Sequence, residues 1–118
     1  CLRACPTGAL EKAHTLNANH CLSYLTIENR GEIPPREARL LGNRLYGCDT
    51  CQQVCPWNRF AIPAIEPDFQ PSEAFLQLQK EDLKMFTKDD YNRIFAKSAV
   101  KRAKYEGLIR TIKHLNIE

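Results

Sequence analysis

Three cysteines near the middle of the chain have the spacing of ligands to an iron–sulfur cluster. Cys48, Cys51 and Cys55 are separated by two and then three residues, and Pro56 follows directly. Two intervening residues let a tight turn direct both sulfurs at one cubane, whereas three carry the last cysteine on to a second cubane. The proline then fixes φ and stops the turn from continuing. The spacing therefore predicts 4Fe–4S ligation.

The amino-terminal residues repeat the end of this motif. Cys1 and Cys5 are again separated by three residues, and Pro6 follows, which predicts a pseudo-symmetric pair of clusters. Because Cys21 is the only cysteine outside the two runs, it completes one ligand set, which is Cys5, Cys21, Cys48 and Cys51. Cys1 and Cys55 would hold the second cluster. Its remaining ligands are expected upstream, so we interpret the chain as the C-terminal piece of a longer protein.

Two other roles for the cysteines stay open on spacing alone. Six cysteines in a short chain can pair as disulfides. However, the chain has no secretory signal, and its 43% apolar and 26% charged residues are typical of an intracellular protein. Zinc also binds Cys-x2-Cys pairs, although no histidine lies at a matching second spacing. His14 and His20 are of a type found more often on the surface than as ligands.

Charge is distributed unevenly along the chain. The formal net charge of +3 is too small to indicate a partner, but residues 63–90 hold three Lys and seven Asp or Glu, whereas residues 91–118 hold seven Lys or Arg and two Glu. A helix is predicted from Ser98, with most of these basic side chains off its apolar stripe. They could bind a nucleic-acid backbone, and the candidates are Lys97, Lys101, Arg102, Lys104 and Arg110. An ordinary solvated helix face would give the same pattern.

The elements that must position the cysteines are short. Residues 11–20 are predicted to form a loop or a short hairpin, and apolar spacing predicts helices over 21–28 and 36–41. Regularly spaced prolines predict an extended linker, and these are Pro63, Pro67 and Pro71. Short helices follow, for which the N-cap candidates are Ser72, Thr87 and Ser98. No apolar run approaches about 18 residues, so no membrane segment is expected.

Several of these stretches resemble the epoxyqueuosine reductase family. They are the first cysteine run continued as Pro-Thr-Gly-Ala-Leu, then Cys21-Leu-Ser-Tyr-Leu-Thr-Ile-Glu-Asn-Arg-Gly-Glu-Ile-Pro34, and then residues 42–61 around the main cysteine run. Residues 95–110 are also similar to the C-terminal end of that family. The resemblance extends over essentially the whole chain but over only the C-terminal part of a family member.

The resemblance implies a mainly α fold, in which a ferredoxin-like double-cluster domain over residues 1–62 precedes a small helical-repeat-like domain over residues 63–118. Members of the family reduce epoxyqueuosine in tRNA, with cobalamin, two 4Fe–4S clusters and an external electron donor. In such a protein Cys21 would be a cluster ligand, and the basic C-terminal helix would contact the anticodon region of tRNA.

The cobalamin site and the catalytic acid of the family lie upstream of Cys1. We therefore expect no catalytic residue in this chain and no activity from this chain alone. We further expect a cytoplasmic, monomeric protein. The alternative is a stand-alone ferredoxin-like electron carrier, which would hold a cluster but would have no salt-sensitive affinity for tRNA.

Overall fold

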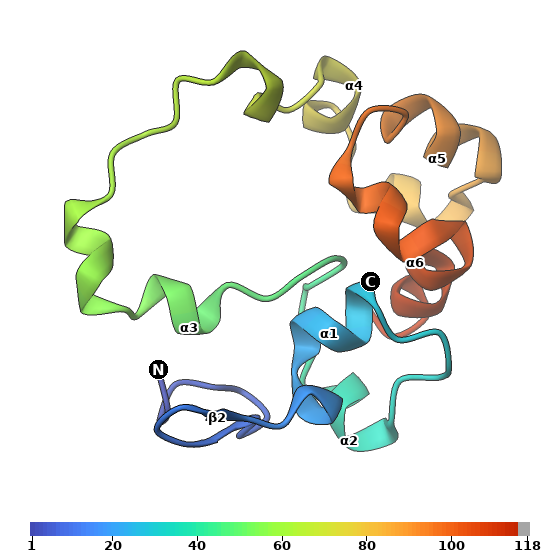
Figure 1. The fold of residues 1–118 in the computed structure, drawn as a ribbon. Coiled ribbons are helices and arrows are strands. Elements are labelled where there is room, and N and C mark those ends of the chain that lie inside the picture. Colours follow the sequence, from blue (N-terminus) through green and yellow to red (C-terminus); the bar gives the residue numbers. More distant parts are fainter. Residues whose placement is uncertain (116–118) are drawn as a thin grey trace.

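Short helices make up most of the regular structure in the computed structural model, which describes residues 1–115 (Figure 1). Within that part of the chain, strands are confined to one hairpin, which confirms the prediction of a mainly α fold. We call residues 1–55 the N-terminal half, residues 56–71 the arch and residues 72–115 the C-terminal half. None of the described helices combines the length and apolar character that a membrane crossing needs.

The N-terminal half begins with a hairpin and continues with short helices. β1 (Leu10–Lys12) pairs antiparallel with β2 (Thr15–Leu16), which confirms the hairpin expected within residues 11–20. The helices that follow are η1 (Ala18–His20), α1 (Leu22–Ile27), α2 (Pro35–Arg39) and α3 (Thr50–Gln53). Of these, α1 and α2 agree within two residues with the two helices that apolar spacing predicts.

A small apolar core holds the N-terminal half together. It lies between α1, α2 and their connecting loop, and its buried members are Leu22, Leu25, Ile33, Ala38 and Leu41. Cys48 packs against this core. The core therefore fixes the position of one predicted ligand, although it is small for the length of chain that it organises.

The C-terminal half consists of short helices with short connections. They are α4 (Glu73–Leu76), η4 (Glu81–Met85), α5 (Lys88–Ile94), η5 (Ala99–Ala103) and α6 (Lys104–Ile112). The predicted N-caps are confirmed, since the side chains of Ser72, Thr87 and Ser98 each accept a hydrogen bond from a backbone N–H of the following helix. At Thr87 the capping box with Asp90 is complete.

Aromatic residues dominate the core of the C-terminal half. Its buried members are Leu83, Phe86, Tyr91, Ile94, Phe95, Ala103 and Leu108. The ring of Phe95 lies at the centre, with centroids 6.3 Å from Phe86 and 6.0 Å from Tyr91. This half is thus built around apolar contacts between α5, η5 and α6.

The single helix predicted from Ser98 is wrong, because the chain forms two elements there. Lys104 has φ +61°, which L-residues rarely adopt, and it separates η5 from α6. The change of direction lets Ala103 and Leu108 enter the same core. Burial of these two residues therefore determines where the helix breaks.

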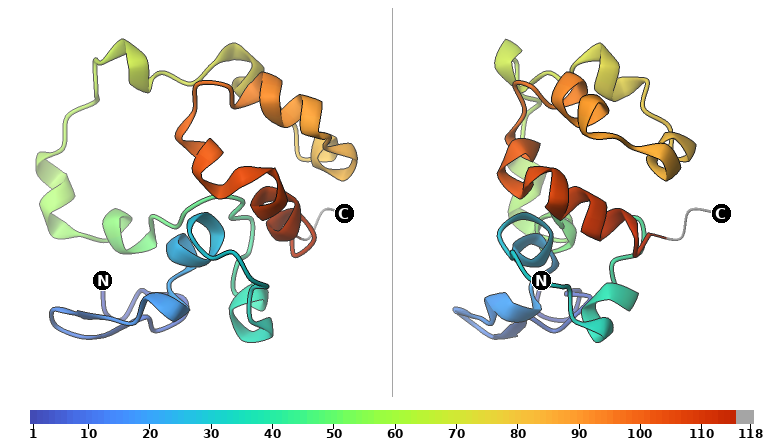
Figure 2. Two further views of the ribbon diagram at one scale, coloured as in Figure 1. Left: turned by 45° about the vertical axis from the view of Figure 1, so that its right-hand side comes forward. Right: turned by 90° about the vertical axis from the view of Figure 1, so that its right-hand side faces the viewer.

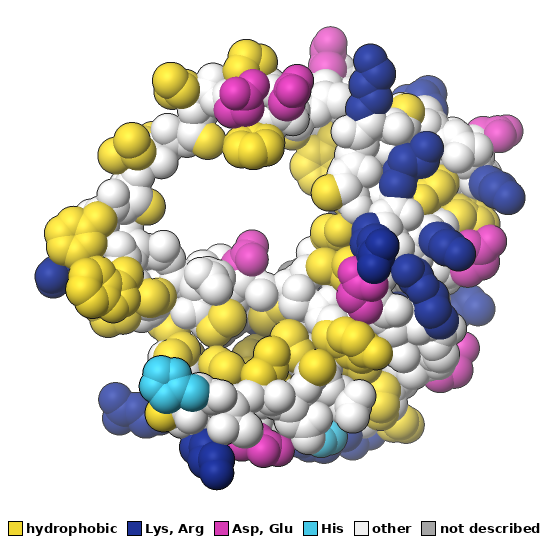
Figure 3. All heavy atoms as spheres, viewed as in Figure 1, with side chains coloured by type: hydrophobic (Ala, Val, Ile, Leu, Met, Phe, Trp, Pro, Cys, Tyr) yellow, Lys and Arg dark blue, Asp and Glu magenta, His cyan; other side chains and the backbone are white. Residues whose placement is uncertain are grey.

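The arch connects the two halves and includes the linker predicted from the prolines. Short turns interrupt its extended backbone at η2 (Pro56–Phe60) and η3 (Pro67–Phe69). Figures 1 and 2 show it joined to the rest of the molecule at its two ends. Figure 3 shows the opening that the arch encloses together with the two halves.

Candidate metal centre

The first cysteine run forms a turn that supplies hydrogen bonds to sulfur. The N–H of Cys5 donates to the carbonyl oxygen of Cys1 at 3.1 Å, and Gly8 has φ +70° as the chain leaves the turn. Burial alone raises the pKa of the Cys5 thiol. Hydrogen bonds outweigh that effect and lower the pKa to about 7, and they come from the backbone of Leu10, Thr7 and Ala9 and from the Thr7 hydroxyl. A thiol that ionises near neutral pH is suited to bind iron as a thiolate.

The second cysteine run lies on and after α3. Cys51 lies within this helix, and Cys55 is the N-cap of η2. In Figures 1 and 2 the amino terminus lies next to α3, so Cys1 begins on the side of the molecule where the second run ends. The sharing of one cluster by Cys1 and Cys55 stays a prediction.

A buried carboxylate braces the loops that carry two other cysteines. Glu37 is 2% exposed, and its Oε1 lies 2.8 Å from His20 Nδ1 and accepts a hydrogen bond from the Arg36 guanidinium, also at 2.8 Å. Arg36 donates further to the carbonyl oxygen of Thr7 at 3.0 Å, and the Thr7 hydroxyl donates to the carbonyl oxygen of His20 at 2.6 Å. These four residues form one connected network.

The network joins two parts of the chain that are distant in sequence. Thr7 follows Cys5 by two residues, and His20 immediately precedes Cys21. Burial opposes ionisation of the Glu37 carboxyl, but hydrogen bonds from His20 and Arg36 outweigh it, so the pKa lies below the ordinary glutamate value. An ionised Glu37 therefore holds the loops of two predicted ligands of the same cluster.

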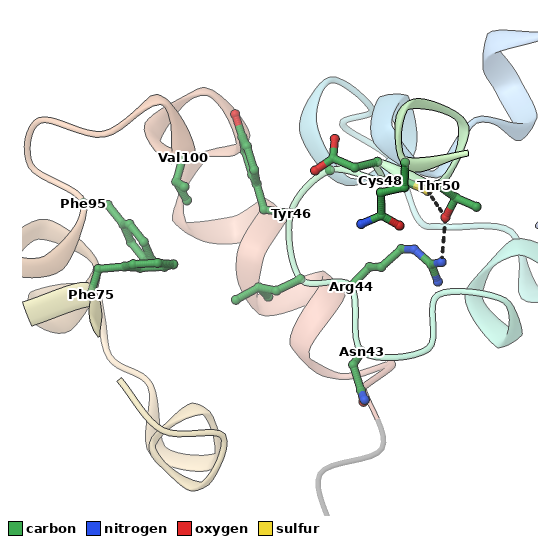
Figure 4. Close-up of a pocket in the computed structure, with 12 residues that line it drawn as sticks. Asn43, Arg44, Tyr46, Cys48, Thr50, Phe75, Phe95 and Val100 are labelled. Atoms are coloured by element: carbon green, nitrogen blue, oxygen red, sulfur yellow. Dashed lines mark hydrogen bonds between the residues drawn. The ribbon is translucent and has the colours of Figure 1, made fainter. Parts of the chain in front are cut away.

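A second set of hydrogen bonds fixes the loop of Cys48. The N–H of Gly47, which has φ +77°, donates to Thr26 Oγ1 at 2.9 Å and ties the loop to α1. Arg44 donates to Thr50 Oγ1 at 2.9 Å, and Thr50 Oγ1 lies 3.6 Å from Cys48 Sγ (Figure 4). The loop before α3 is therefore held from both sides.

Cys48 also lines a cavity of about 620 Å³ between the two halves (Figure 4). Arg44 and Tyr46 line it from the N-terminal half, and Phe75 and Phe95 line it from the C-terminal half. The tyrosine also donates to the carbonyl oxygen of Ala99 at 2.8 Å. The thiol thus lies where the two halves meet.

The donor set fits 4Fe–4S clusters better than the other two metal or disulfide roles. All six cysteines are free thiols, so none is paired as a disulfide. Within residues 1–115, no three His, Cys, Asp or Glu side chains converge closely enough to hold a single metal ion, whereas zinc requires ligands at about 2.3 Å. A cubane instead separates its thiolates at its corners. The assignment of each cysteine to a particular cluster stays a prediction.

Arginines predicted to face nucleic acid instead connect the two halves. Arg110 is 9% exposed, and its guanidinium donates to the carbonyl oxygens of Leu25, Asn29 and Gly31 at 2.6–2.7 Å. Burial lowers its pKa below the usual arginine value. Its assignment to an exposed basic face is therefore wrong, because the C-terminal carbonyls around α1 occupy its donors.

Arg102 is also engaged with the N-terminal half. It forms a bidentate ion pair with Glu28, with Nε 2.8 Å from Oε1 and an Nη 2.9 Å from Oε2. Arg30 reaches back in the other direction and donates to the carbonyl oxygens of Arg102 and Ala103 at 3.0 and 3.3 Å. The pair with Glu28 remains exposed.

The lysines of the predicted basic surface are exposed. Lys97, Lys101 and Lys104 all point away from the core, and Figure 3 shows Lys and Arg side chains gathered over the C-terminal helices. We call these three residues the lysine face. Their contact with nucleic acid stays a prediction.

The sequence analysis did not identify the residues that position the cysteines. Thr7 and Thr50 each follow a cysteine by two residues, and this shared spacing was a signal that could have found them. Glu37 and Arg36 gave no such signal, because their partners lie in loops distant in sequence.

Comparison with protein families defines the class of the N-terminal half. A family described as "4Fe-4S double cluster binding domain" matches residues 1–58. This match contains all six cysteines, so this half is a double-cluster iron–sulfur domain.

Comparison with individual proteins extends the likeness to the whole chain. It is 45% identical over 115 residues to an epoxyqueuosine reductase from Cellulophaga algicola, which covers 98% of this chain and 38% of that protein. Reductases of the same name from Yersinia pestis and Escherichia coli are 40% and 38% identical, and 28% and 30% of their lengths are covered. The chain thus spans between about a quarter and two fifths of these relatives.

Solved structures give the same result. An epoxyqueuosine reductase determined with an epoxyqueuosine-modified tRNA-Tyr stem loop matches with a TM-score of 0.79, at 33% identity over 97% of this chain and 29% of that chain. The reductase from Bacillus subtilis matches with a TM-score of 0.80, also at 33% identity, over 97% of this chain and 30% of that chain. The chain belongs to the epoxyqueuosine reductase family and represents part of such a protein.

Proposed function

We propose that the chain is the cluster-binding, C-terminal part of an oxidoreductase that reduces epoxyqueuosine in tRNA to queuosine. When bound, two 4Fe–4S clusters supply one-electron transfer toward a cobalamin held elsewhere in the full-length protein. The observation that carries this proposal is the double-cluster cysteine pattern, which lies on a fold shared with a reductase solved with a modified tRNA stem loop.

The residues of this chain hold and insulate the clusters. One cluster takes Cys5, Cys21, Cys48 and Cys51, and the other takes Cys1 and Cys55 together with ligands from outside residues 1–118. Backbone N–H groups at Cys5 and the network around Glu37 keep the thiolates oriented. In this proposal the double-cluster domain covers residues 1–62 and the helical domain covers residues 63–118.

The lysine face of the C-terminal half binds the tRNA backbone in this proposal. Lys97, Lys101 and Lys104 are exposed on neighbouring turns, and Arg102 adds a partly neutralised charge beside them. Phosphate contacts of this kind give affinity that falls with salt. The full-length protein is proposed to act as a cytoplasmic monomer that accepts electrons from an external donor.

Iron analysis and tRNA binding on the full-length protein test the two parts separately. Anaerobic protein should contain about eight irons per chain, with the visible and paramagnetic-resonance signals of cubane clusters. Absence of iron and sulfide contradicts the cluster part, whatever the tRNA result.

Filter binding then tests the tRNA part. The triple variant with Lys97, Lys101 and Lys104 changed to Glu should lose affinity and reduce the salt dependence by roughly one per lost phosphate contact. A matched control changes Lys80, Lys84 and Lys88 to Glu and should retain affinity. Equal affinity of both variants contradicts the lysine face, and iron content without any tRNA affinity indicates a plain electron carrier.

A further inference from the structure

The arch carries a row of large apolar side chains that nothing in the described structure covers. Trp57, Phe60, Ile62, Ile65 and Phe69 are 76, 63, 87, 94 and 76% exposed. All residues from 56 to 73 are exposed. Contiguous apolar surface of this kind usually marks an interaction site.

The arch is shaped by its sequence. Prolines open η2 and η3, and two more interrupt the chain between and after them, at Pro63 and Pro71. Trp57 packs on Phe60 with centroids 5.9 Å apart, and the Arg59 guanidinium lies 4.6 Å from the Phe60 ring centroid. A segment restricted in this way loses little further entropy when a partner binds.

The charge of the arch favours a protein surface over a nucleic acid. Arg59 is its only basic residue, and Glu66 and Asp68 give it a negative balance. A phosphate backbone requires positive charge, which lies instead on the C-terminal helices. The partner of the arch is therefore an apolar protein surface.

The position of the arch indicates which protein surface this is. It starts at Pro56, directly after Cys55, and the amino terminus lies next to α3 (Figure 1). The second cluster of the proposed function needs ligands from outside this chain near these two cysteines. The relatives contain such additional length, because the chain covers only 28–38% of the proteins compared above.

We propose that the arch docks on the portion of the full-length protein that supplies the missing ligands, and so clamps that portion over the second cluster. This inference rests on the proposed function, because it assumes a second cluster completed from outside residues 1–118. Burial of the arch excludes water from the cluster edge beside Cys55.

Photo-cross-linking in the full-length protein tests the clamp. The probe p-benzoylphenylalanine replaces Ile65, which is 94% exposed, and a control places it at Met85, which is 83% exposed outside the arch. The arch probe should link to peptides of the same chain from outside residues 1–118, and the control should not. Links to a second copy, to tRNA or only within residues 1–118, equal links from the control, or no links, overturn the clamp.

Iron content is measured on the same samples. Full iron without the expected cross-link refutes the clamp and leaves the proposed function intact. Absent iron in the unlabelled protein refutes the proposed function itself.

A separate observation concerns the threonine between Arg44 and Cys48 (Figure 4). The Arg44 guanidinium donates to Thr50 Oγ1 at 2.9 Å, so Thr50 keeps its own hydroxyl hydrogen to donate. The Cys48 thiol now donates to the same oxygen, at 3.6 Å. A thiolate bound to iron has no hydrogen to donate, so the Thr50 hydroxyl can donate to Cys48 Sγ instead.

The equivalent threonine of the first run cannot act in this way. Thr7 also follows its cysteine by two residues, but its hydroxyl donates to the carbonyl oxygen of His20 at 2.6 Å. The thiolate of Cys5 depends on backbone N–H groups instead. The two cysteine runs therefore differ in how hydrogen bonds reach sulfur.

We infer that Arg44 and Thr50 form a relay that raises the reduction potential of the cluster held by Cys48. Hydrogen bonds to ligand sulfur and nearby positive charge stabilise the reduced, more negative cluster. This inference also rests on the proposed function. Both residues are positioning residues, since neither is a ligand.

Redox titration of the full-length protein, followed by paramagnetic resonance, tests the relay. Thr50→Val, which removes the hydroxyl at similar volume, should shift the potential of one cluster to a more negative value, and Thr50→Ser should restore it. Arg44→Gln, which keeps the hydroxyl, should give a smaller shift in the same direction. Wild-type potentials in both Thr50→Val and Arg44→Gln at full iron content overturn the relay, whereas missing cubane signals in the wild type refute the proposed function.

Discussion

The C-terminal half is organised by aromatic packing, whereas the N-terminal half is organised by a small apolar core and buried polar contacts. In the former, Phe95 packs between Phe86 and Tyr91. In the latter, the Glu37 carboxylate connects two cysteine loops. Since a structural metal commonly compensates for a small core, the difference indicates that the N-terminal half gains stability from its clusters and the C-terminal half does not.

The largest effect is expected from the aromatic core. Phe95→Ala should reduce the free energy of unfolding by about 3–5 kcal/mol, because the side chain is only 2% exposed. Urea unfolding followed by circular dichroism measures the loss. The control Met85→Ala removes an 83% exposed side chain and should change stability by less than about 0.5 kcal/mol. Equal effects of the two variants contradict the aromatic core as the centre of this half.

A smaller loss is expected where the two halves meet. Arg110→Ala should cost about 3 kcal/mol, because it leaves the carbonyl oxygens of Leu25, Asn29 and Gly31 without their donor. Hydrogen exchange should become faster in residues 25–31. Arg102→Ala serves as the control and should cost at most about 1 kcal/mol, since its pair with Glu28 is exposed. Unchanged exchange in Arg110→Ala contradicts a structural role.

Glu37 gives the N-terminal half a specific dependence on pH. Its pKa is lowered in the folded protein, so the stabilisation is complete above the ordinary glutamate value of about 4.3 and is lost as the pH falls through the lower folded value. Glu37→Gln should cost about 1–3 kcal/mol at neutral pH and should weaken the loss of stability in acid. The measurement is the urea midpoint against pH, with Glu81→Gln as an exposed control. The same acid dependence in Glu37→Gln and the wild type contradicts the proposed network.

The smallest effect is expected at the break between η5 and α6. Lys104→Gly should stabilise the chain by about 1 kcal/mol, because glycine adopts φ +61° without strain. The control Lys101→Gly lies within η5 and should destabilise by up to about 1 kcal/mol. Thermal unfolding distinguishes the two, and destabilisation by both contradicts strain at Lys104.

Features that depend on neighbouring residues were predictable from the sequence. Ser72, Thr87 and Ser98 cap helices through N–H groups two or three residues away, and the cysteine spacing encodes the cluster motif within a few residues. The short helices α1 and α2 also follow from local apolar spacing. Such signals do not need the tertiary fold.

Features that depend on distant partners were not predictable. Arg110 has the composition of a basic face, but its partners precede it by 79–85 residues, so only the folded chain shows that it is buried. The break at Lys104 likewise follows from the burial of Ala103 and Leu108 in one core. Glu37 became recognisable only when the fold brought His20 beside it.

Iron and sulfide analysis of Cys21→Ala tests the central claim most directly, because Cys21 lies outside both cysteine runs. In anaerobically prepared full-length protein, with Ser23→Ala as the control, we predict that the variant loses about half of its iron, corresponding to one of two clusters. Wild-type iron content in Cys21→Ala would contradict the proposed ligand set.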